Sequence, residues 1–514
     1  MNAVLLRSII LGFLLFFALA CEKLEVENLN EPDAVRALDD PEMLIEILRE
    51  GTLDLLWGMT GDHGMYFQGQ ADQMTCTKFY PPQSWASTSE PRWRVENLHD
   101  SWWFNYGWND LFSAINAANT ILKASNEGIV LKINDMDRTS DAEIAAYFVK
   151  GMAQGYLGMI YDKAYVVNID TDLANLKLQD YKTLITEGLA NIRAAIDKAE
   201  AAPDDFKYDF MVNVDMDKTR FIRMCYSFMA KIAISEARTA RETIQTNYAT
   251  IKEWVDAGFT EDFYIESEPG VWYNRMIDWC TIRLNWIDST GYLPPDQKIF
   301  HLVNPDQYQE YYHQDTGFYS PVVTDDQRIY NAPVPNGTTG YFKHVNGFGY
   351  LNSDRDRYLF TVHTVNRWYM DNDFTRAGIM NPMFMYVEGQ LIKAECDLKE
   401  GTLNTVQEVM NRPDLPRKAV GQMPDLDINT FEEAIWWLHY EYAVELNLAA
   451  TITGTWAFMR RWDLFQAGTM TMLPVPHFEL EMNGDEIYSF GGAEYAGRTG
   501  SASGPGWRTV ENGQ

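Results

Sequence analysis

Two groups of aromatic and polar residues have the types and spacing of a ligand-binding surface. The first group, between residues 58 and 100, consists of Tyr80, Trp85, Trp93 and Arg94. The second group, between residues 257 and 381, consists of Trp272, Trp279, Trp286 and Tyr292, with Asn285 and Asp288 between them. Trp and Tyr rings supply flat, rigid contact area at low entropic cost, and the polar residues add hydrogen bonds. The alternative for each ring is burial in the scaffold.

Motifs for covalent or metal-dependent catalysis are missing from the sequence. Neither G-x-S-x-G, H-E-x-x-H nor G-x-x-x-x-G-K-[ST] occurs, and the eight histidines lack metal-ligand spacing. Among 73 acidic residues some pair of carboxylates can always be found, so their abundance does not indicate acid–base catalysis. We therefore expect no enzymatic activity and no bound cofactor.

Two acidic segments begin like calcium-binding loops. They read Asn168-x-Asp170-x-Asp172 and Asn213-x-Asp215-x-Asp217. Both lack the glycine at the sixth position and the glutamate at the twelfth that complete such a loop. The sequence therefore predicts solvated acids rather than a metal site.

The overall charge excludes several partners. The 514 residues include 42 Lys and Arg against 73 Asp and Glu, a formal net charge of −31. Nucleic acids and anionic membrane surfaces attract clustered basic residues, so neither is expected as a partner. Apolar residues make up 46% of the chain and charged residues 22%, which is typical of a folded protein with ample core. The unusual figure is the aromatic content of 14%.

The N-terminal segment has the features of a lipoprotein signal. Arg7 precedes an apolar run from Ile9 to Ala20, which is too short to span a bilayer. Cys21 follows directly, so residues 1–20 are predicted to be cleaved and the Cys21 thiol to carry lipid, which anchors the chain without a transmembrane helix. The alternative is a plain secretory signal.

The other cysteines are far apart in the sequence. They are Cys76, Cys225, Cys280 and Cys396. Without a C-x-x-C pair a structural zinc site is not expected, and in a chain of this size we expect mostly buried thiols.

Helical periodicity dominates the rest of the chain. Helices are predicted at residues 102–124, 141–161, 181–202, 218–241, 248–257, 382–399, 404–412, 431–448 and 456–466. In the first, Tyr106 is expected on the buried face with Leu111 and Ile115, and the second is expected to open with an Asp141 cap. Five tryptophans on these helices are assigned to the core: Trp102, Trp103, Trp436, Trp437 and Trp462.

Small residues at helix-crossing points suggest paired helices of the tetratricopeptide type. Ala145, Ala153 and Gly155 are spaced so that another helix can approach the second predicted helix closely. Between the helices lie two long aromatic segments, residues 58–100 and 257–381, where recognition is expected. The fold class is therefore predicted to be mainly α.

Five motifs, in order along the chain, resemble those of one known family. They are Asn28-Leu29-Asn30-Glu31-Pro32; the helix from Tyr106 to Leu122; Tyr386-Val387-Glu388 followed by Leu391, Ala394 and Glu395; Arg461-Trp462-Asp463-Leu464-Phe465; and Leu473-Pro474-Val475-Pro476 followed by Glu479-Leu480. Their order behind a lipoprotein signal resembles the SusD/RagB family, surface lipoproteins of Bacteroidetes, over essentially all of the mature chain. Arg461 and Asp463 belong to a fold motif and are expected to be structural.

The resemblance implies both a fold and a partner. It implies one SusD-like domain at residues 21–514, with tetratricopeptide-like hairpins at about 30–257 and 381–466 and a loop-rich insert at about 258–380. It implies that the protein carries a ligand, usually an oligosaccharide, to a SusC-like TonB-dependent outer-membrane transporter. Three acidic residues after Cys21 are similar to the tag that directs such lipoproteins to the cell surface: Glu22, Glu25 and Glu27.

The aromatic groups fit a sugar ligand, but other functions stay open. Sugars present apolar C–H faces that stack on Trp and Tyr, and hydroxyls that Asn, Asp and Arg bind. The alternatives are a peptide ligand, as in some relatives, a glycoside hydrolase, and a structural or adhesive surface protein.

Overall fold

The computed structural model describes residues 40–74, 94–95, 101–281, 295–308, 321–330, 340–344, 363–368, 378–449, 451 and 454–504. The predicted signal sequence, Cys21 and Cys76 lie outside these residues. Within them, no helix is both long and apolar enough to cross a membrane.

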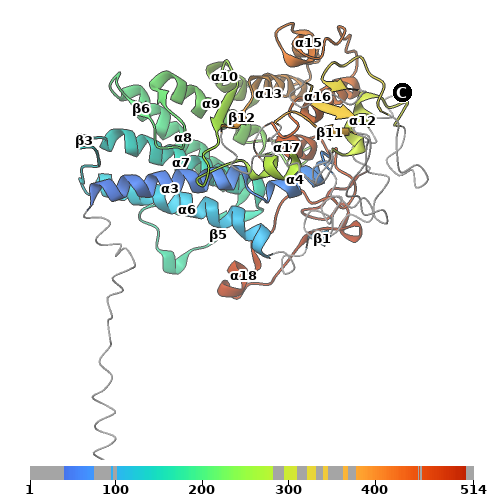
Figure 1. Cartoon of the computed structure of the whole chain (residues 1–514). Coiled ribbons are helices and arrows are strands. Elements are labelled where there is room, and N and C mark those ends of the chain that lie inside the picture. The colour runs from blue at the N-terminus through green and yellow to red at the C-terminus, as the bar shows by residue number, and fades with distance from the viewer. Residues whose placement is uncertain are drawn as a thin grey trace, which may run out of the picture.

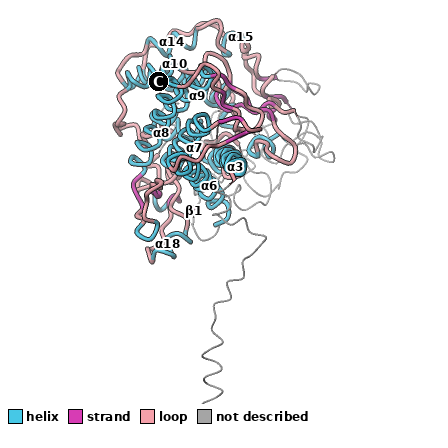
Figure 2. Tube along the Cα trace, turned by 90° about the vertical axis from the view of Figure 1, so that its left-hand side faces the viewer, coloured by secondary structure: helices cyan, strands magenta, loops and turns pink. Residues whose placement is uncertain are grey.

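A row of consecutive helices forms one side of the molecule (Figure 1). It consists of α3 (Pro41–Thr60), α6 (Ser101–Asn126), α7 (Thr139–Ile160), α8 (Tyr181–Ala201), α9 (Lys218–Ile234) and α10 (Tyr248–Ala257). Each helix packs against the next in the row, and Figure 2 looks nearly along α3, α6 and α7. The row continues through α13 (Tyr386–Lys399) to α14 (Asn404–Asn411). The prediction of a mainly α fold is confirmed.

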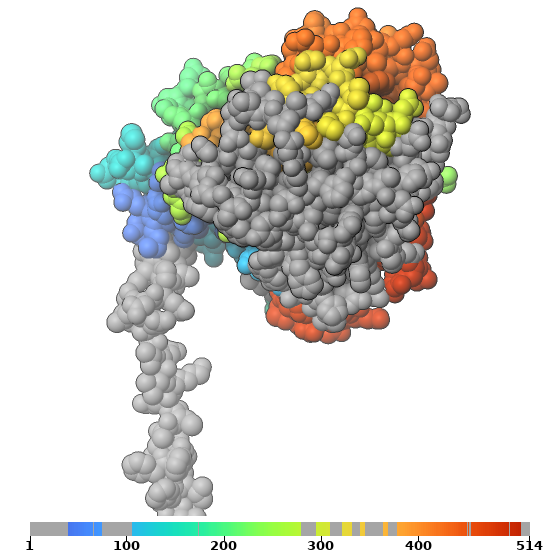
Figure 3. Space-filling view, turned by 45° about the vertical axis from the view of Figure 1, so that its right-hand side comes forward, coloured from blue at the N-terminus to red at the C-terminus, as the bar shows by residue number. Residues whose placement is uncertain are grey.

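Shorter elements occupy the other side of the molecule, which comes forward in Figure 3. The helices there are α4 (Gly64–Gln70), α11 (Arg275–Thr281), α12 (Gln297–Val303), α15 (Pro416–Ala419), α16 (Phe431–Val444), α17 (Gly454–Arg461) and α18 (His477–Asn483). Two short 3-10 helices are η1 (Leu173–Asn175) and η3 (Ala493–Tyr495).

The strands are short and form small ladders. Antiparallel pairs join β1 (Arg94–Val95) to β13 (Phe490–Gly491), β2 (Lys132–Ile133) to β3 (Met136–Asp137), β4 (Lys163–Tyr165) to β5 (Leu178–Asp180), β6 (Lys207–Tyr208) to β7 (Met216–Asp217), and β8 (Phe263–Glu266) to β12 (Met380–Phe384). A three-stranded sheet has β10 (Phe342–His344) between β11 (His363–Val365), which is antiparallel to it, and β9 (Ile329–Tyr330), which is parallel.

Several helix boundaries differ from the prediction. Pro382 lies in β12, where it pairs with Tyr264 of β8, so α13 begins only at Tyr386. Helix α9 ends at Ile234, seven residues before the predicted Arg241, and α3 was not predicted at all. Its start is nevertheless regular, since the Asp40 carboxylate accepts from the backbone of the first turn.

Two expectations about side chains were wrong. Tyr106 is 39% exposed rather than buried with Leu111 and Ile115. Asp141 does not cap α7; it lies in the first turn, 2.7 Å from the Arg138 guanidinium at the cap position. An acid there still favours the helix, because it complements the positive end of the helix dipole.

Glycines allow α7 and α8 to approach very closely. A Cβ atom placed on Gly188 of α8 would lie 2.6 Å from the backbone nitrogen of Gly155 and 2.8 Å from the carbonyl oxygen of Gly151. A Cβ on Gly155 would also lie 2.6 Å from Ile232 of α9. The predicted close helix approach at Gly155 is confirmed.

A buried ionic network attaches the segment before β9 to α16. The Arg328 guanidinium lies 2.8 Å from Asp326, 2.8 Å from Glu441 and 3.2 Å from Glu445. Tyr440 donates to Asp326 at 2.7 Å, and all of these side chains are buried. The loss of Arg328 would leave the buried carboxylates of Asp326 and Glu441 without the cation between them, so this arginine is what attaches the segment to the helix.

The remaining core assignments can be compared with the structure residue by residue. Cys225 and Cys396 are buried thiols, as expected. Trp436, Trp437 and Trp462 are half-buried and pack against the core, whereas Trp102 and Trp103 are placed only by their position on α6.

Candidate functional site

The two aromatic segments of the sequence meet in space. Met74 of the first forms a β-bridge with Pro295 of the second, and Asp296 N–H donates to the Gln73 carbonyl oxygen at 3.2 Å. Lys298 of α12 extends the junction with an ion pair of 2.6 Å to Asp72. Residues more than 200 positions apart are therefore fixed against each other.

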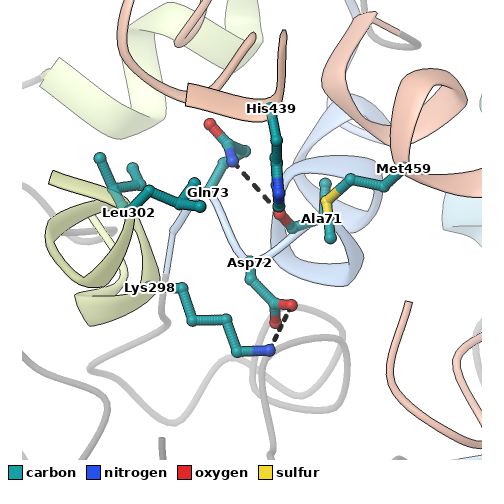
Figure 4. Close-up of a pocket in the computed structure, with 8 residues that line it drawn as sticks. Ala71, Asp72, Gln73, Lys298, Leu302, His439 and Met459 are labelled. Atoms are coloured by element: carbon teal, nitrogen blue, oxygen red, sulfur yellow. Dashed lines mark hydrogen bonds and ion pairs between the residues drawn. The ribbon is translucent and has the colours of Figure 1, made fainter. Parts of the chain in front are cut away.

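A small cavity lies at this junction (Figure 4). Ala71, Asp72 and Gln73 face Lys298, Ile299 and Leu302 of α12, while His439 of α16 and Met459 of α17 close the other side.

The cavity is too small to be a sugar pocket. It has room for roughly one water molecule. Burial lowers the pKa of His439 to about 3, so its ring is neutral, and its Nδ1 has no hydrogen-bond partner among the described residues. A ligand the size of a sugar does not fit into this cavity.

A larger aromatic and charged surface is built on α3 and the start of α11. The Arg275 guanidinium lies over the Trp57 ring, 4.6 Å from its centroid, and the Tyr273 ring meets the same indole edge-on at 5.7 Å. Arg275 Nη1 donates to Asp62 at 2.9 Å, and the arginine side chain remains 38% exposed. We call Trp57, Tyr273, Arg275 and Asp62 the α3–α11 platform.

Two further carboxyl groups give the platform its electrostatic character. Burial, with the neighbouring charge of Asp54 and Asp62, raises the pKa of Asp110 on α6 to about 7, against an opposing effect of Arg275. Burial and the charge of Glu50 raise the pKa of Asp54 to about 6. Acidic groups thus outnumber the single guanidinium, and the local potential disfavours another anion.

The geometry of the α3–α11 platform suits the recognition of a neutral polyol. Half-buried Trp57 and Tyr273 supply apolar ring surface, the exposed part of Arg275 supplies donors, and the carboxylates supply acceptors. Groups of three or more metal-ligating side chains in suitable geometry are not found among the described residues. The arrangement can bind and orient a ligand.

The predicted site residues have mixed outcomes. Trp272 requires a correction, because it has no exposed surface and packs in the core beneath the turn that its backbone forms with Glu268. Arg94 lies on β1 opposite Gly491, and Trp279 lies on α11. Outside the described residues are Tyr80, Trp85, Trp93, Trp286 and Tyr292.

Comparison with known proteins adds information at the level of structure only. No protein-family model and no curated protein matches the chain. A SusD superfamily protein from Bacteroides vulgatus matches 84% of this chain and 89% of its own, with a TM-score of 0.54 and 14% identity. A SusD superfamily protein from Bacteroides thetaiotaomicron matches 83% of this chain and 89% of its own, with a TM-score of 0.52 and 14% identity. The chain has a SusD-like fold.

One further match bears a functional description. A SusD-like carbohydrate-binding protein from Bacteroides fragilis matches 80% of this chain and 85% of its own, with a TM-score of 0.50 and 14% identity. The SusD-like fold confirms the resemblance that the sequence motifs indicated. At these identities the likeness carries no residue of a binding site from one protein to another.

The α3–α11 platform of this SusD-like fold was missed in the sequence. Trp57 lies at the edge of the first aromatic segment, on a helix that was not predicted, and Tyr273 directly follows Trp272. The available signal in the sequence was that two aromatic residues, Trp272 and Tyr273, are adjacent. In the structure a tight turn buries Trp272 and leaves Tyr273 half-buried. Periodicity alone does not decide which of the two is buried.

Proposed function

We propose that this chain is a lipid-anchored glycan-binding protein of the cell surface that captures an oligosaccharide and delivers it to a SusC-like TonB-dependent transporter. The observation that carries the proposal is the α3–α11 platform in a SusD-like fold, a fold shared with a protein described as carbohydrate-binding. The proposal includes cleavage after residue 20 and one SusD-like domain at residues 21–514.

The chemistry of the platform favours a neutral glycan. Aromatic rings bind the C–H face of a sugar, and a guanidinium beside carboxylates binds its hydroxyls. Uronic or sulfated sugars would meet Asp54, Asp62 and Asp110, so like-charge repulsion opposes them. Seven further residues are proposed to extend this surface: Tyr80, Trp85, Trp93, Arg94, Trp279, Trp286 and Tyr292.

The test is isothermal titration of the purified mature chain with maltoheptaose, xylohexaose, mannohexaose and polygalacturonate. At least one neutral oligosaccharide should bind, and Trp57→Ala should weaken that binding by about tenfold or more. Trp437→Ala is the matched control, because Trp437 is also half-buried beneath an arginine, Arg417 at 5.2 Å, but lies on α16. Equal affinities of the two variants would remove the platform from the binding site.

Alternative functions give different results in the same assay. New reducing ends would indicate a glycoside hydrolase, and heat only with peptides would indicate a peptide carrier. No binding heat with glycans or peptides, together with co-purification with filaments, would indicate a structural or adhesive protein. Each of these results would overturn the proposed function.

Anchoring and partnership need a separate experiment in cells. A Cys21→Ser variant should lose incorporation of labelled palmitate and should no longer sediment with outer membranes. The wild-type chain should co-purify with a TonB-dependent barrel after gentle detergent extraction. Unchanged labelling of the variant would contradict the lipoprotein assignment.

A further inference from the structure

A second aromatic and arginine cluster lies apart in the sequence from the α3–α11 platform. The Arg367 guanidinium is placed between two rings, 3.9 Å from the centroid of Tyr341 and 4.3 Å from that of Trp368. Tyr264 of β8 lies beside Trp368, with ring centroids 6.0 Å apart. Trp368 and Tyr264 are both half-buried, so part of each residue is accessible.

The backbone at Trp368 is strained. Its φ of +62° lies in the left-handed region, where a bulky side chain is a rare outlier. Such a conformation costs on the order of 1–3 kcal/mol and persists only where surrounding contacts enforce it. Contacts with the rest of the protein therefore hold the indole in a position that a relaxed backbone would not provide.

The enforcing contacts come from the buried network on α16. Arg367 lies 2.9 Å from the Glu445 carboxylate and donates to the Glu445 carbonyl oxygen at 2.5 Å. The Trp368 indole N–H donates to the Asn447 carbonyl oxygen at 3.3 Å. Glu445 is itself bound by Arg328 and by the Tyr341 hydroxyl, so the support beneath the indole is rigid.

The polar groups at this cluster are largely satisfied from within. Arg367 pairs with Glu445, and the Tyr264 hydroxyl donates to Asp262 at 3.0 Å. An occupant of the cluster therefore gains mainly from ring surface, which fits the apolar C–H face of a sugar better than an ion or a charged peptide side chain. The α3–α11 platform repeats the same construction, a guanidinium stacked on an indole and paired with a carboxylate.

We propose that Trp368 and Tyr264 form a second saccharide-binding subsite, which takes the apolar face of one sugar unit of a neutral glycan. The inference rests on the proposed function, because it assumes that the protein binds glycans. It adds a second contact surface that belongs to β8 and the segment after β11 and is supported by Asn447, just after α16.

The experiment compares variants at the two surfaces against the same neutral oligosaccharides. Trp368→Ala should weaken binding of the best ligand by about tenfold relative to Trp437→Ala. Trp368→Phe, which keeps a ring and most of the packing, should give an intermediate loss of affinity. If the alanine variant fails to fold, the affinity of the Trp368→Phe variant tests the subsite. Thermal melting of each variant shows which of them are folded.

The outcomes separate the subsite from the proposed function. If Trp57→Ala weakens binding while folded Trp368 variants match the control, the second subsite is wrong and the glycan-binding function stands. If the wild-type protein binds none of the oligosaccharides, both proposals are overturned. Loss of affinity at both surfaces supports both.

Discussion

Arg461 and Glu395 form a bidentate ion pair in the interior of the protein. The distances are 2.6 Å from Nε to Oε2 and 2.7 Å from Nη2 to Oε1, and both side chains are buried. The Tyr442 hydroxyl donates to Oε1 at 2.6 Å and the Trp462 indole to Oε2 at 2.8 Å. A single carboxylate thus joins α13, α16 and the end of α17.

Replacing Arg461 by leucine should be strongly destabilising. The change leaves the Glu395 carboxylate buried without its cation, which costs about 3–5 kcal/mol of the free energy of unfolding. Urea unfolding of the wild-type and variant proteins measures the difference. An Arg49→Leu variant is the control, because Arg49 forms an ion pair of similar length with Glu46 on the exposed side of α3 and should lose under about 0.5 kcal/mol. Similar losses in the two variants would contradict a structural role for the buried pair.

Asp110 should make the protein less stable at alkaline pH. Its folded-state pKa of about 7 lies above the unfolded value of about 3.9, so the folded protein binds more protons between these pH values. The free energy of unfolding therefore falls as pH rises from about 4 to about 7, and the stabilisation is complete only below that range.

The Asp110→Asn variant should remove much of this pH dependence. The difference in unfolding free energy between variant and wild type should be about 1–3 kcal/mol more favourable to the variant at pH 8 than at pH 4. This value is reduced because the Asp110 carboxyl is partly screened by solvent. Chemical unfolding at the two pH values provides the measurement, with Asp197→Asn on the exposed surface of α8 as control. If both variants keep the wild-type dependence of the unfolding free energy on pH, burial of the Asp110 carboxyl does not cause that dependence.

The fold could be predicted because its signals are local or ordered along the chain. Helices α6, α8 and α10 begin and end close to their predicted residues, since amphipathic spacing defines them. The motifs containing Glu395 and Arg461 indicated the family resemblance, but only the structure shows that the two residues pair. Helix α3 was missed although its own pattern predicts it: Asp40 and Pro41 mark its start, and buried apolar residues recur at helical spacing from Leu44 to Met59.

The candidate site was far less predictable. Sequence composition located the two aromatic segments, and the bridge between Met74 and Pro295 shows that they do meet. Which ring is buried is a tertiary outcome: Trp272 is enclosed, while its neighbour Tyr273 reaches Trp57. The strained backbone of Trp368 depends on a contact with Asn447, about 80 residues later in the chain, and no local pattern encodes it.

Calcium should have no effect on stability. In the structure Asp172 caps η1 through the Ala174 N–H, and Asp217 caps α9 through the Arg220 N–H at 2.8 Å, so one acid of each calcium-like segment already has a backbone partner. Thermal melting with added calcium chloride or with EDTA should give the same midpoint. Asp217→Ala should nevertheless lower stability by about 1 kcal/mol through the lost cap. A calcium-dependent rise in the midpoint would show that a metal site exists.

Gly188→Ala should disrupt the contact between α7 and α8. The added methyl group would lie 2.6 Å from the Gly155 nitrogen and 2.8 Å from the Gly151 oxygen, and because both are backbone atoms neither can rotate away. We expect a loss of about 1–3 kcal/mol, measured by urea unfolding. Gly389→Ala on α13 is the matched control, since the nearest atom to its new methyl group is Val255 Cγ1 at an ordinary 3.4 Å. Alanine also favours a helix interior over glycine by up to about 1 kcal/mol, so Gly389→Ala should be neutral or stabilising. Opposite signs for the same chemical change would show that close backbone packing, and not helix propensity, requires glycine at position 188.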